Sequence, residues 1–206
     1  MEYRHGRMGN GLLRPLLLSS SQSMDKGVYI LLVQNDECQI RVGASGKRIF
    51  SAGWHAYVGS ALGAGGFARV MRHFRLNSEK DRRPCWHIDS LLISPCFQVT
   101  GAYCIHTQER IECHIAHQMT GDVITGFGSS DCSCKGHLFY YPYDPTGELL
   151  HLIHSLSRQG TIHGVDFRSP YPAGMNGLQG HIICIYKADT NQSSFERGPQ
   201  DDQSCN

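Results

Sequence analysis

The apolar run at residues 27–33, Gly-Val-Tyr-Ile-Leu-Leu-Val, constrains the fold more than any other feature. Its β-branched and aromatic side chains predict a buried strand. Turn residues at 35–37 precede an alternating polar and apolar stretch at 39–42, which we expect to pair with the first strand as a hairpin. A third strand is expected at 54–60. Because these strands follow one another through short links, we expect a small, mostly antiparallel three-stranded sheet.

Helical patterns follow this sheet and place the fold in the α/β (α+β) class. Phe67, Val70, Met71 and Phe74 recur at helical spacing after a glycine-rich turn, so residues 67–74 predict an amphipathic helix. In chain order we then expect a short helix at 88–92, a strand at 97–107, a helix at 109–119, a loop at 126–134, a strand at 137–141 and a closing helix at 148–157. Residues 181–187 have strand character but no evident partner.

The length of 206 residues fits one domain with flanking segments. We expect a flexible leader at 1–24, a domain at 25–143, a closing helix within 144–159 and a largely disordered tail at 160–206. The nine cysteines are an odd number without the spacing of a secreted disulfide scaffold, so we interpret them as mostly reduced and the protein as cytoplasmic. No apolar run reaches about 18 residues, so no membrane partner is expected.

Positive charge gathers in one segment although the whole chain is almost neutral. The formal net charge of +1 excludes a protein that coats nucleic acid by bulk charge. Between residues 64 and 83, six positive side chains stand against Glu79 and Asp81, which leaves a local charge of +4. We predict that this set contacts a phosphate backbone, the alternative being a solvated helix face; its members are Arg69, Arg72, Arg75, Lys80, Arg82 and Arg83.

Five side chains that are far apart in the sequence could converge at one edge of the sheet: Tyr29, Tyr57, Arg69, His73 and Glu112. Together they offer the groups that a phosphodiester nuclease needs. A carboxylate holds a divalent cation, an arginine neutralises charge on phosphate oxygens, and a hydroxyl or imidazole accepts a proton from water. The alternative is that the tyrosines are ordinary strand residues and the arginine is solvated.

The sequence resembles the GIY-YIG nuclease superfamily over about residues 25–143. The paired motif is Gly27-Val-Tyr29 followed by Tyr57-Val-Gly59. One branch, known mainly from bacterial and archaeal genomes and sometimes fused to a base-excision repair glycosylase, matches further blocks in the same order. These blocks are Ala56-Tyr-Val-Gly-Ser-Ala-Leu62, Arg72-His73, Trp86-His-Ile-Asp89, Glu112-Cys113, Gly126-Phe-Gly-Ser-Ser-Asp-Cys132 and His137-Leu138-Phe139.

The resemblance implies a metal-dependent endonuclease that hydrolyses DNA, in repair or processing, with base-excision repair proteins as candidate partners. It implies that Tyr29 or Tyr57 activates the attacking water, that Arg69 binds the scissile phosphate and that His73 takes part in proton transfer. Glu112 would hold Mg²⁺ or Mn²⁺. The family's polar residue near the end of the domain, often Asn, is missing, so one of residues 129–131 (Ser, Ser, Asp) would substitute. The rival function is a non-catalytic nucleic-acid or protein-binding module.

A second cluster of candidate ligands is Cys132, Cys134 and His137, in a Cys-x-Cys-x-x-His pattern. Cysteine and histidine at this density could bind zinc. The pattern supplies three ligands, so Cys85 or Cys113 would have to complete a tetrahedron. We favour instead the alternative that these are small buried residues that hold the loop against the sheet. His87 and Asp89, two residues apart, are interpreted as structural or as neighbours of the active site.

Overall fold

The computed structural model of the chain describes residues 26–43, 46–159 and 181–185. The expected leader at 1–24 lies outside these residues, and so does the expected tail except for 181–185. A six-stranded sheet forms the centre, in the order β6-β7-β4-β1-β5-β8. Its strands are β1 (Gly27–Asn35), β4 (Gly53–Ser60), β5 (Phe97–His106), β6 (Asp122–Val123), β7 (Leu138–Tyr141) and β8 (His181–Ile185).

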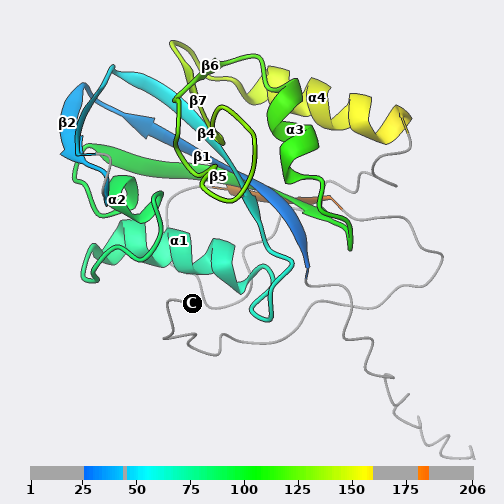
Figure 1. The fold of residues 1–206 in the computed structure, drawn as a ribbon, viewed down its shortest axis with the longest axis horizontal. Coiled ribbons are helices and arrows are strands. Elements are labelled where there is room, and N and C mark those ends of the chain that lie inside the picture. Colours follow the sequence, from blue (N-terminus) through cyan, green and yellow to red (C-terminus); the bar gives the residue numbers. More distant parts are fainter. Residues whose placement is uncertain (1–25, 44–45, 160–180, 186–206) are drawn as a thin grey trace, which may run out of the picture.

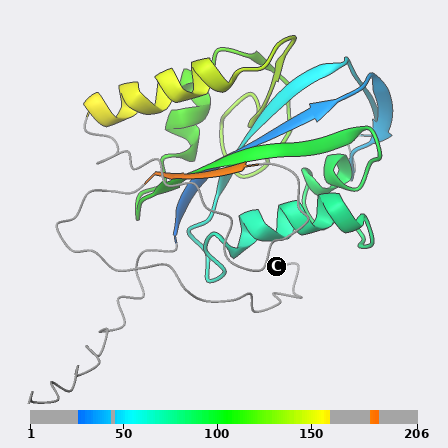
Figure 2. The same cartoon turned by 180° about the vertical axis from the view of Figure 1, so that it is seen from behind.

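The central sheet is larger than the three strands expected from the sequence, although the α+β class is confirmed. Its first five strands pair antiparallel, with β1 between β4 and β5. Strand β8 pairs parallel with β5, so the segment that had no evident partner has one (Figure 2). Strands β5, β7 and β8 lie where the sequence predicts strands, but they are distant in sequence from β1, which is why local patterns did not indicate their place in the sheet.

The expected hairpin between the first strand and residues 39–42 is wrong. Strand β2 (Cys38–Arg41) instead pairs with β3 (Lys47–Phe50) in a separate two-stranded sheet. Strand β1 has no free edge, because β4 and β5 occupy both of its sides along most of its length. The alternation of residues 39–42 therefore reflects a strand with one exposed face outside the central sheet.

Helices cover both faces of the sheet (Figure 1). Helices α1 (Ala68–Glu79) and α2 (Asp89–Leu92) lie on one face, and α3 (Glu112–Gln118) and α4 (Thr146–Arg158) lie on the other. Strand β1 is buried on both sides: Tyr29, Leu31 and Val33 belong to the cluster under α1, whereas Val28, Ile30 and Leu32 belong to the cluster under α4. This double burial explains why residues 27–33 are uniformly apolar.

Two helices differ from their expected lengths. Helix α1 continues past Phe74 to Glu79 and ends at Lys80, which adopts a left-handed conformation with φ of 52°. Helix α3 begins at Glu112 rather than at residue 109, since Ile111 has a non-helical backbone with φ of −99° and ψ of 5°. The later start puts Glu112 in the first turn of α3, at the end of the helix rather than along its side.

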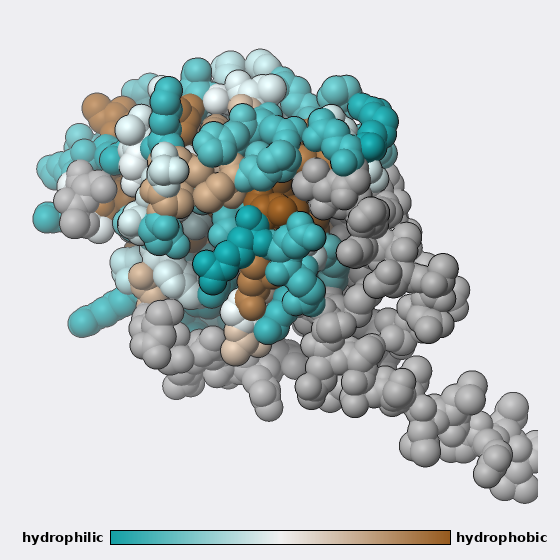
Figure 3. Space-filling model, turned by 45° about the vertical axis from the view of Figure 1, so that its right-hand side comes forward, coloured by the Kyte–Doolittle hydropathy of each residue, from teal (hydrophilic) through white to brown (hydrophobic). Residues whose placement is uncertain are grey.

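The face of the molecule shown in Figure 3 is mostly hydrophilic, with hydrophobic residues set between polar ones. Ile49 and Tyr143 are the large hydrophobic side chains that stand out, with exposed fractions of 72% and 56%. Among the described residues, no helix has the length and apolar character needed to cross a membrane.

Asn77 ties α1 to the segment that leads into β5. Its buried side-chain amide donates to the carbonyls of Leu92 and Phe97, at 3.0 and 2.8 Å, and its oxygen accepts from the N–H of Val99 at 2.9 Å. These bonds satisfy backbone groups that are removed from water. The last turn of α1 is therefore fixed by one polar side chain rather than by apolar packing alone.

We predict that Asn77→Ala lowers the free energy of unfolding by about 2–4 kcal/mol, because it leaves buried backbone groups without partners. Urea unfolding measures the change. The control is Ser78→Ala, at an exposed position on the same helix, with an expected effect within about 0.5 kcal/mol. Equal effects of the two substitutions would contradict the role of Asn77.

Candidate active site

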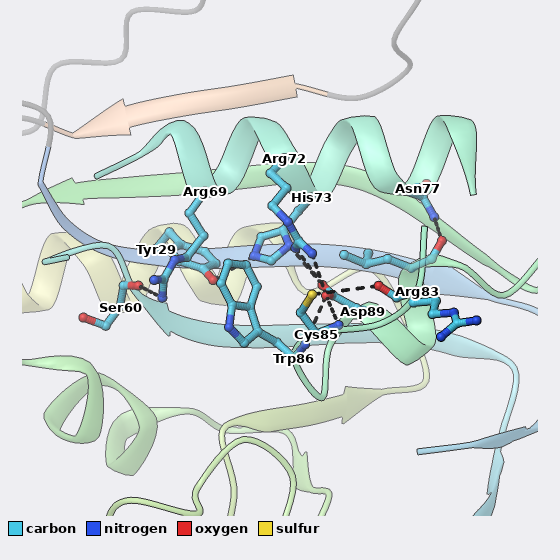
Figure 4. A network of polar contacts seen from close by, with 11 residues as sticks. Tyr29, Ser60, Arg69, Arg72, His73, Asn77, Arg83, Cys85, Trp86 and Asp89 are labelled. Carbon is cyan, nitrogen blue, oxygen red and sulfur yellow. Dashed lines mark hydrogen bonds and ion pairs between the residues drawn. The ribbon is translucent and has the colours of Figure 1, made fainter. Parts of the chain in front are cut away.

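Helix α1 carries Arg69 and His73 above the strands that hold the two motif tyrosines. Figure 4 shows the side chains of Arg69 and His73 pointing from α1 toward the sheet, with His73 beside Tyr29. The hydroxyl oxygen of Tyr29 lies 2.9 Å from Nε2 of His73. The rings of Tyr29 and Tyr57 are 6.3 Å apart between centroids. The structure thus brings four of the five predicted catalytic side chains to the α1 face.

Two glycines shape the space around the tyrosines. Gly59 lies directly opposite Tyr29 in the β1–β4 register, and a Cβ atom there would stand 2.5 Å from the Tyr29 hydroxyl. Gly128 has a φ of +69°, and a Cβ atom there would stand 2.9 Å from the Tyr57 ring. Both positions exclude larger residues, so each tyrosine ring packs against a glycine backbone.

Asp89 is the buried anchor of this site, and the sequence indicated its structural role only in general terms. Its fully buried carboxylate accepts two hydrogen bonds from Arg72, at 3.0 and 2.8 Å (Figure 4). It also accepts from the backbone N–H groups of Cys85 and Trp86. Burial opposes ionisation, but these donors hold the pKa of Asp89 below its usual range.

The Asp89 carboxylate also orients the His73 ring. One of its oxygens lies 3.9 Å from Nδ1 of His73, and Nδ1 has no hydrogen-bond partner. A proton on Nδ1 faces this negative charge favourably, whereas a lone pair there would be repelled. The proton is therefore assigned to Nδ1, which leaves Nε2 to accept the hydrogen bond that the Tyr29 hydroxyl donates.

Burial sets the protonation states at the site. It lowers the pKa of His73 to about 3, although the charge of Asp89 acts in the opposite direction. It raises the pKa of Tyr57 to about 12 and that of Tyr29 well above its usual value. At neutral pH both tyrosines are therefore hydroxyls and His73 is a neutral imidazole, which is a proton acceptor.

Trp86 holds two arginines in place. Its ring lies 4.5 Å from the guanidinium carbon of Arg69 and 4.3 Å from that of Arg72. Arg69 also donates to the carbonyl of Ser60, at 2.9 Å, at the end of β4. Arg69 remains half-buried rather than enclosed. Its stacking on Trp86 orients the guanidinium beside the two tyrosines.

The six predicted phosphate-contacting side chains divide into two groups. Arg72 is bound to Asp89, and the Lys80 ammonium donates to the carbonyls of Leu92, Ser94 and Phe97. These two cations hold the fold together. The other four, of which Arg82 pairs with Asp81 at 3.7 Å, lie half-buried or exposed; they are Arg69, Arg75, Arg82 and Arg83.

Glu112 stands at the start of α3 and lies near Tyr57. One of its carboxylate oxygens is buried without a hydrogen-bond partner. Its charge, with that of Asp131, raises the pKa of Tyr57, so both acids lie near that ring. An unpartnered buried oxygen fits a hard cation, because Mg²⁺ is often held by a single carboxylate together with water and substrate phosphate. Residues 129–131 are the candidates to replace the Asn of the GIY-YIG family. Among them, Asp131 carries a charge that contributes to the raised pKa of Tyr57.

A cluster of three thiols and one imidazole lies beside Glu112. Its members are Cys113, Cys132, Cys134 and His137, with donor atoms all within 4.8 Å of one another. This set could hold a metal ion, and its sulfur and nitrogen donors suit zinc rather than Mg²⁺ or Mn²⁺. Cys113 supplies the fourth position. Cys85, the other candidate, lies instead in the loop before α2, where its N–H binds Asp89.

We predict that Asp89→Ala lowers the free energy of unfolding by about 3–5 kcal/mol, because it leaves the partly buried Arg72 without its counter-charge. The matched control is Asp81→Ala, which removes an exposed ion pair with Arg82 and should change the free energy by at most about 1 kcal/mol. Chemical denaturation of both variants measures the difference. A mild effect at Asp89 would contradict its role as the anchor.

The buried neutral state of His73 predicts a pH-dependent stability. Its folded pKa, about 3, lies below the unfolded value of about 6.5, so the unfolded chain takes up this proton first as the pH falls. The contribution of His73 is complete above about pH 6.5 and is lost toward lower pH by up to about 1.4 kcal/mol per pH unit. The stability advantage of the natural chain over His73→Gln should therefore shrink between about pH 7 and about pH 5.

Urea unfolding of the two chains at several pH values measures this advantage. His55, whose burial lowers its pKa to about 4, is present in both chains, and its effect cancels in the comparison. An advantage that is independent of pH would show that His73 is not buried in its neutral form.

Comparison with known proteins identifies a family for this chain. No curated protein and no solved structure matches the chain. Residues 28–158 match a family model whose description is "Domain of unknown function DUF123". The match runs from β1 through α4 and so includes every residue of the site described above. Because the model covers more than half of the 206 residues, the chain belongs to the DUF123 family.

Proposed function

We propose that the protein is a metal-dependent endonuclease of the GIY-YIG type, which hydrolyses phosphodiester bonds in DNA. The observation that carries the proposal is the hydrogen bond between the Tyr29 hydroxyl and Nε2 of His73, at 2.9 Å, beside a stacked Arg69. This arrangement couples a hydroxyl to a proton acceptor next to a cation. The resemblance of the Gly27-Val-Tyr29 and Tyr57-Val-Gly59 motifs to that superfamily supports the same function.

The proton of the attacking water leaves through Tyr29. Because the Tyr29 hydroxyl donates to His73, its oxygen keeps lone pairs that can accept a hydrogen bond from water. As the water oxygen bonds to phosphorus, Tyr29 takes the water proton and passes its own proton to Nε2 of His73. Burial disfavours the imidazolium that forms, and the charge of the Asp89 carboxylate, 3.9 Å from Nδ1, acts in the opposite direction. The bond to the leaving oxygen breaks, and solvent supplies a proton to that oxygen.

Arg69 stabilises the negative charge that develops on the phosphate oxygens. Its contacts with Trp86 and with the Ser60 carbonyl fix the guanidinium before substrate arrives, so little reorganisation is needed during the reaction. Arg75, Arg82 and Arg83 extend this positive charge along α1 and the following loop. They would contact the backbone of the DNA on either side of the scissile phosphate.

Glu112 would hold the Mg²⁺ or Mn²⁺ ion, since its buried oxygen has no other partner. When bound, such an ion neutralises charge on the phosphate and on the leaving oxygen. The carboxylate stands at the start of α3, near Tyr57. The scissile phosphate would therefore lie beside Tyr57, within reach of both Arg69 and the ion held by Glu112.

We predict that Tyr29→Phe, Arg69→Ala and Glu112→Ala each reduce the rate of DNA cleavage by at least about 100-fold. Matched controls at exposed residues are Tyr143→Phe, Arg158→Ala and Glu109→Ala, which take no part in the proposed site and should keep the natural rate. The assay follows single-turnover cleavage of nicked and branched DNA duplexes. Magnesium is omitted rather than chelated in the metal-free arm, so that other bound metals stay in place.

Binding is measured in parallel by fluorescence anisotropy. We expect Glu112→Ala to bind DNA as the natural chain does, with an affinity that falls steeply as salt is added. Salt-dependent binding without cleavage under either Mg²⁺ or Mn²⁺ would instead show a non-catalytic binding module. Cleavage at the natural rate by Glu112→Ala and Arg69→Ala would contradict the assigned roles.

A further inference from the structure

We propose that Cys113, Cys132, Cys134 and His137 bind one zinc ion. With Zn–S distances of about 2.3 Å and Zn–N distances of about 2.0–2.1 Å, the donors of a tetrahedral zinc site lie about 3.5–3.8 Å from one another. Nε2 of His137 lies 3.5 Å from Sγ of Cys132 and 3.9 Å from Sγ of Cys113. These two distances are close to the spacing that zinc requires, and all four donor atoms lie within 4.8 Å of one another.

The chemistry of the donors selects the metal. Three thiolates and one imidazole form a Cys₃His set, a common structural zinc site, whereas Mg²⁺ and Mn²⁺ prefer oxygen ligands. Cys134 and His137 are buried, and Cys113 and Cys132 are half-buried. A set of four protein ligands with this degree of burial leaves no coordination position for substrate, so the zinc is structural.

The four ligands come from segments on both faces of the sheet. Cys113 belongs to α3, whose Ile115 packs in the cluster under α4. Cys132 and Cys134 lie in the loop before β7, whose Phe127 packs in the cluster under α1. A bound ion would therefore fasten α3 to this loop around the edge of the sheet.

Each segment has its own backbone hydrogen bonds, and the cluster of four ligands lies between the two segments. No hydrogen bond from a side chain caps the first turn of α3. The loop between β6 and β7 contains no helix or strand, and two of the backbone bonds that close it join Gly126 to Lys135 and His137 to Phe127, each at 2.7 Å. A metal ion bound to all four ligands would add a direct connection between the two segments.

The position of Cys113 links this zinc site to Glu112, a link that rests on the proposed nuclease function. The two residues are adjacent in the first turn of α3, so fixing the Cys113 thiolate fixes the helix end that carries the Glu112 carboxylate. The same loop brings Gly128 against the Tyr57 ring. Zinc would thus position both Glu112 and Tyr57 without touching the substrate.

Metal analysis of the full chain, purified under reducing conditions, tests the site directly. We expect about one zinc per chain. Replacement by Co²⁺ should give visible d–d absorption typical of tetrahedral geometry and a thiolate-to-cobalt band in the near ultraviolet. A chain that contains no zinc and takes up none when titrated with it would overturn the proposal, and so would iron as the bound metal.

Cys132→Ser and Cys134→Ser should each lose the zinc and the cobalt spectrum. Cys96→Ser is the matched control, because Cys96 is also a half-buried free thiol but lies beside Cys38, outside the cluster. It should keep about one zinc per chain. A Cys132→Ser chain that retains zinc and the thiolate spectrum would contradict the ligand set.

Thermal unfolding with a zinc chelator gives a second readout that does not depend on the variants. The chelator should lower the midpoint for the natural chain and for Cys96→Ser, and an unchanged midpoint would contradict a structural zinc. Zinc content together with cleavage by Glu112→Ala separates the two proposals. If the natural chain contains zinc but Glu112→Ala cleaves DNA at the natural rate, the zinc site is supported and the nuclease proposal is contradicted. If cleavage requires Glu112 but the chain binds no zinc, only the zinc site is contradicted.

Discussion

The burial of β1 on both faces is the constraint on which the rest of the structure depends. Because β4 and β5 occupy its two edges and helices cover its two sides, β1 is held in one register. A shift by one residue would exchange the side chains of the two faces. This register places Tyr29 on the α1 face, directly opposite Gly59, and so decides which side of the sheet carries the site.

The buried ion pair between Asp89 and Arg72 positions helix α1 over the sheet. Asp89, on the short helix α2, binds Arg72 of α1 and faces the ring of His73, so it sets the rotation of α1 over the sheet. The same rotation directs Arg69 onto Trp86 and His73 onto Tyr29. A buried ion pair of this kind adds little net stability compared with apolar packing, but it strongly penalises any arrangement that separates the pair.

The sequence was sufficient for features that depend on local patterns. The apolar run at 27–33, the helical stripe of Phe67, Val70 and Phe74, and the strand at 54–60 each appear in the structure. Pairing between distant segments was not predictable in this way: the hairpin assigned to residues 39–42 was wrong, and β8 had no assigned partner. Such pairings depend on which strand edges remain free, and this is a property of the whole sheet.

The residues of the candidate site also include some that local motifs predict and others whose roles depend on contacts between distant segments. The residue types of Tyr29, Tyr57, Arg69 and His73 could be selected from their motifs, and β1, β4 and α1 bring them together. The role of Asp89 could not be read from its neighbours, because its partner Arg72 lies on another helix. Cys113 and Cys85 were both candidates for the fourth ligand. The structure places Cys113 in the cluster, whereas Cys85 lies in the loop before α2.

The most direct test of the proposed nuclease site is a crystal structure of Glu112→Gln bound to a DNA duplex that the natural chain cleaves. We predict that the scissile phosphate lies in contact with the Arg69 guanidinium and next to the Tyr29 hydroxyl, on the α1 face of the sheet. A phosphate backbone that crosses another surface, with Arg69 and Tyr29 away from it, would contradict the site and the function proposed for it.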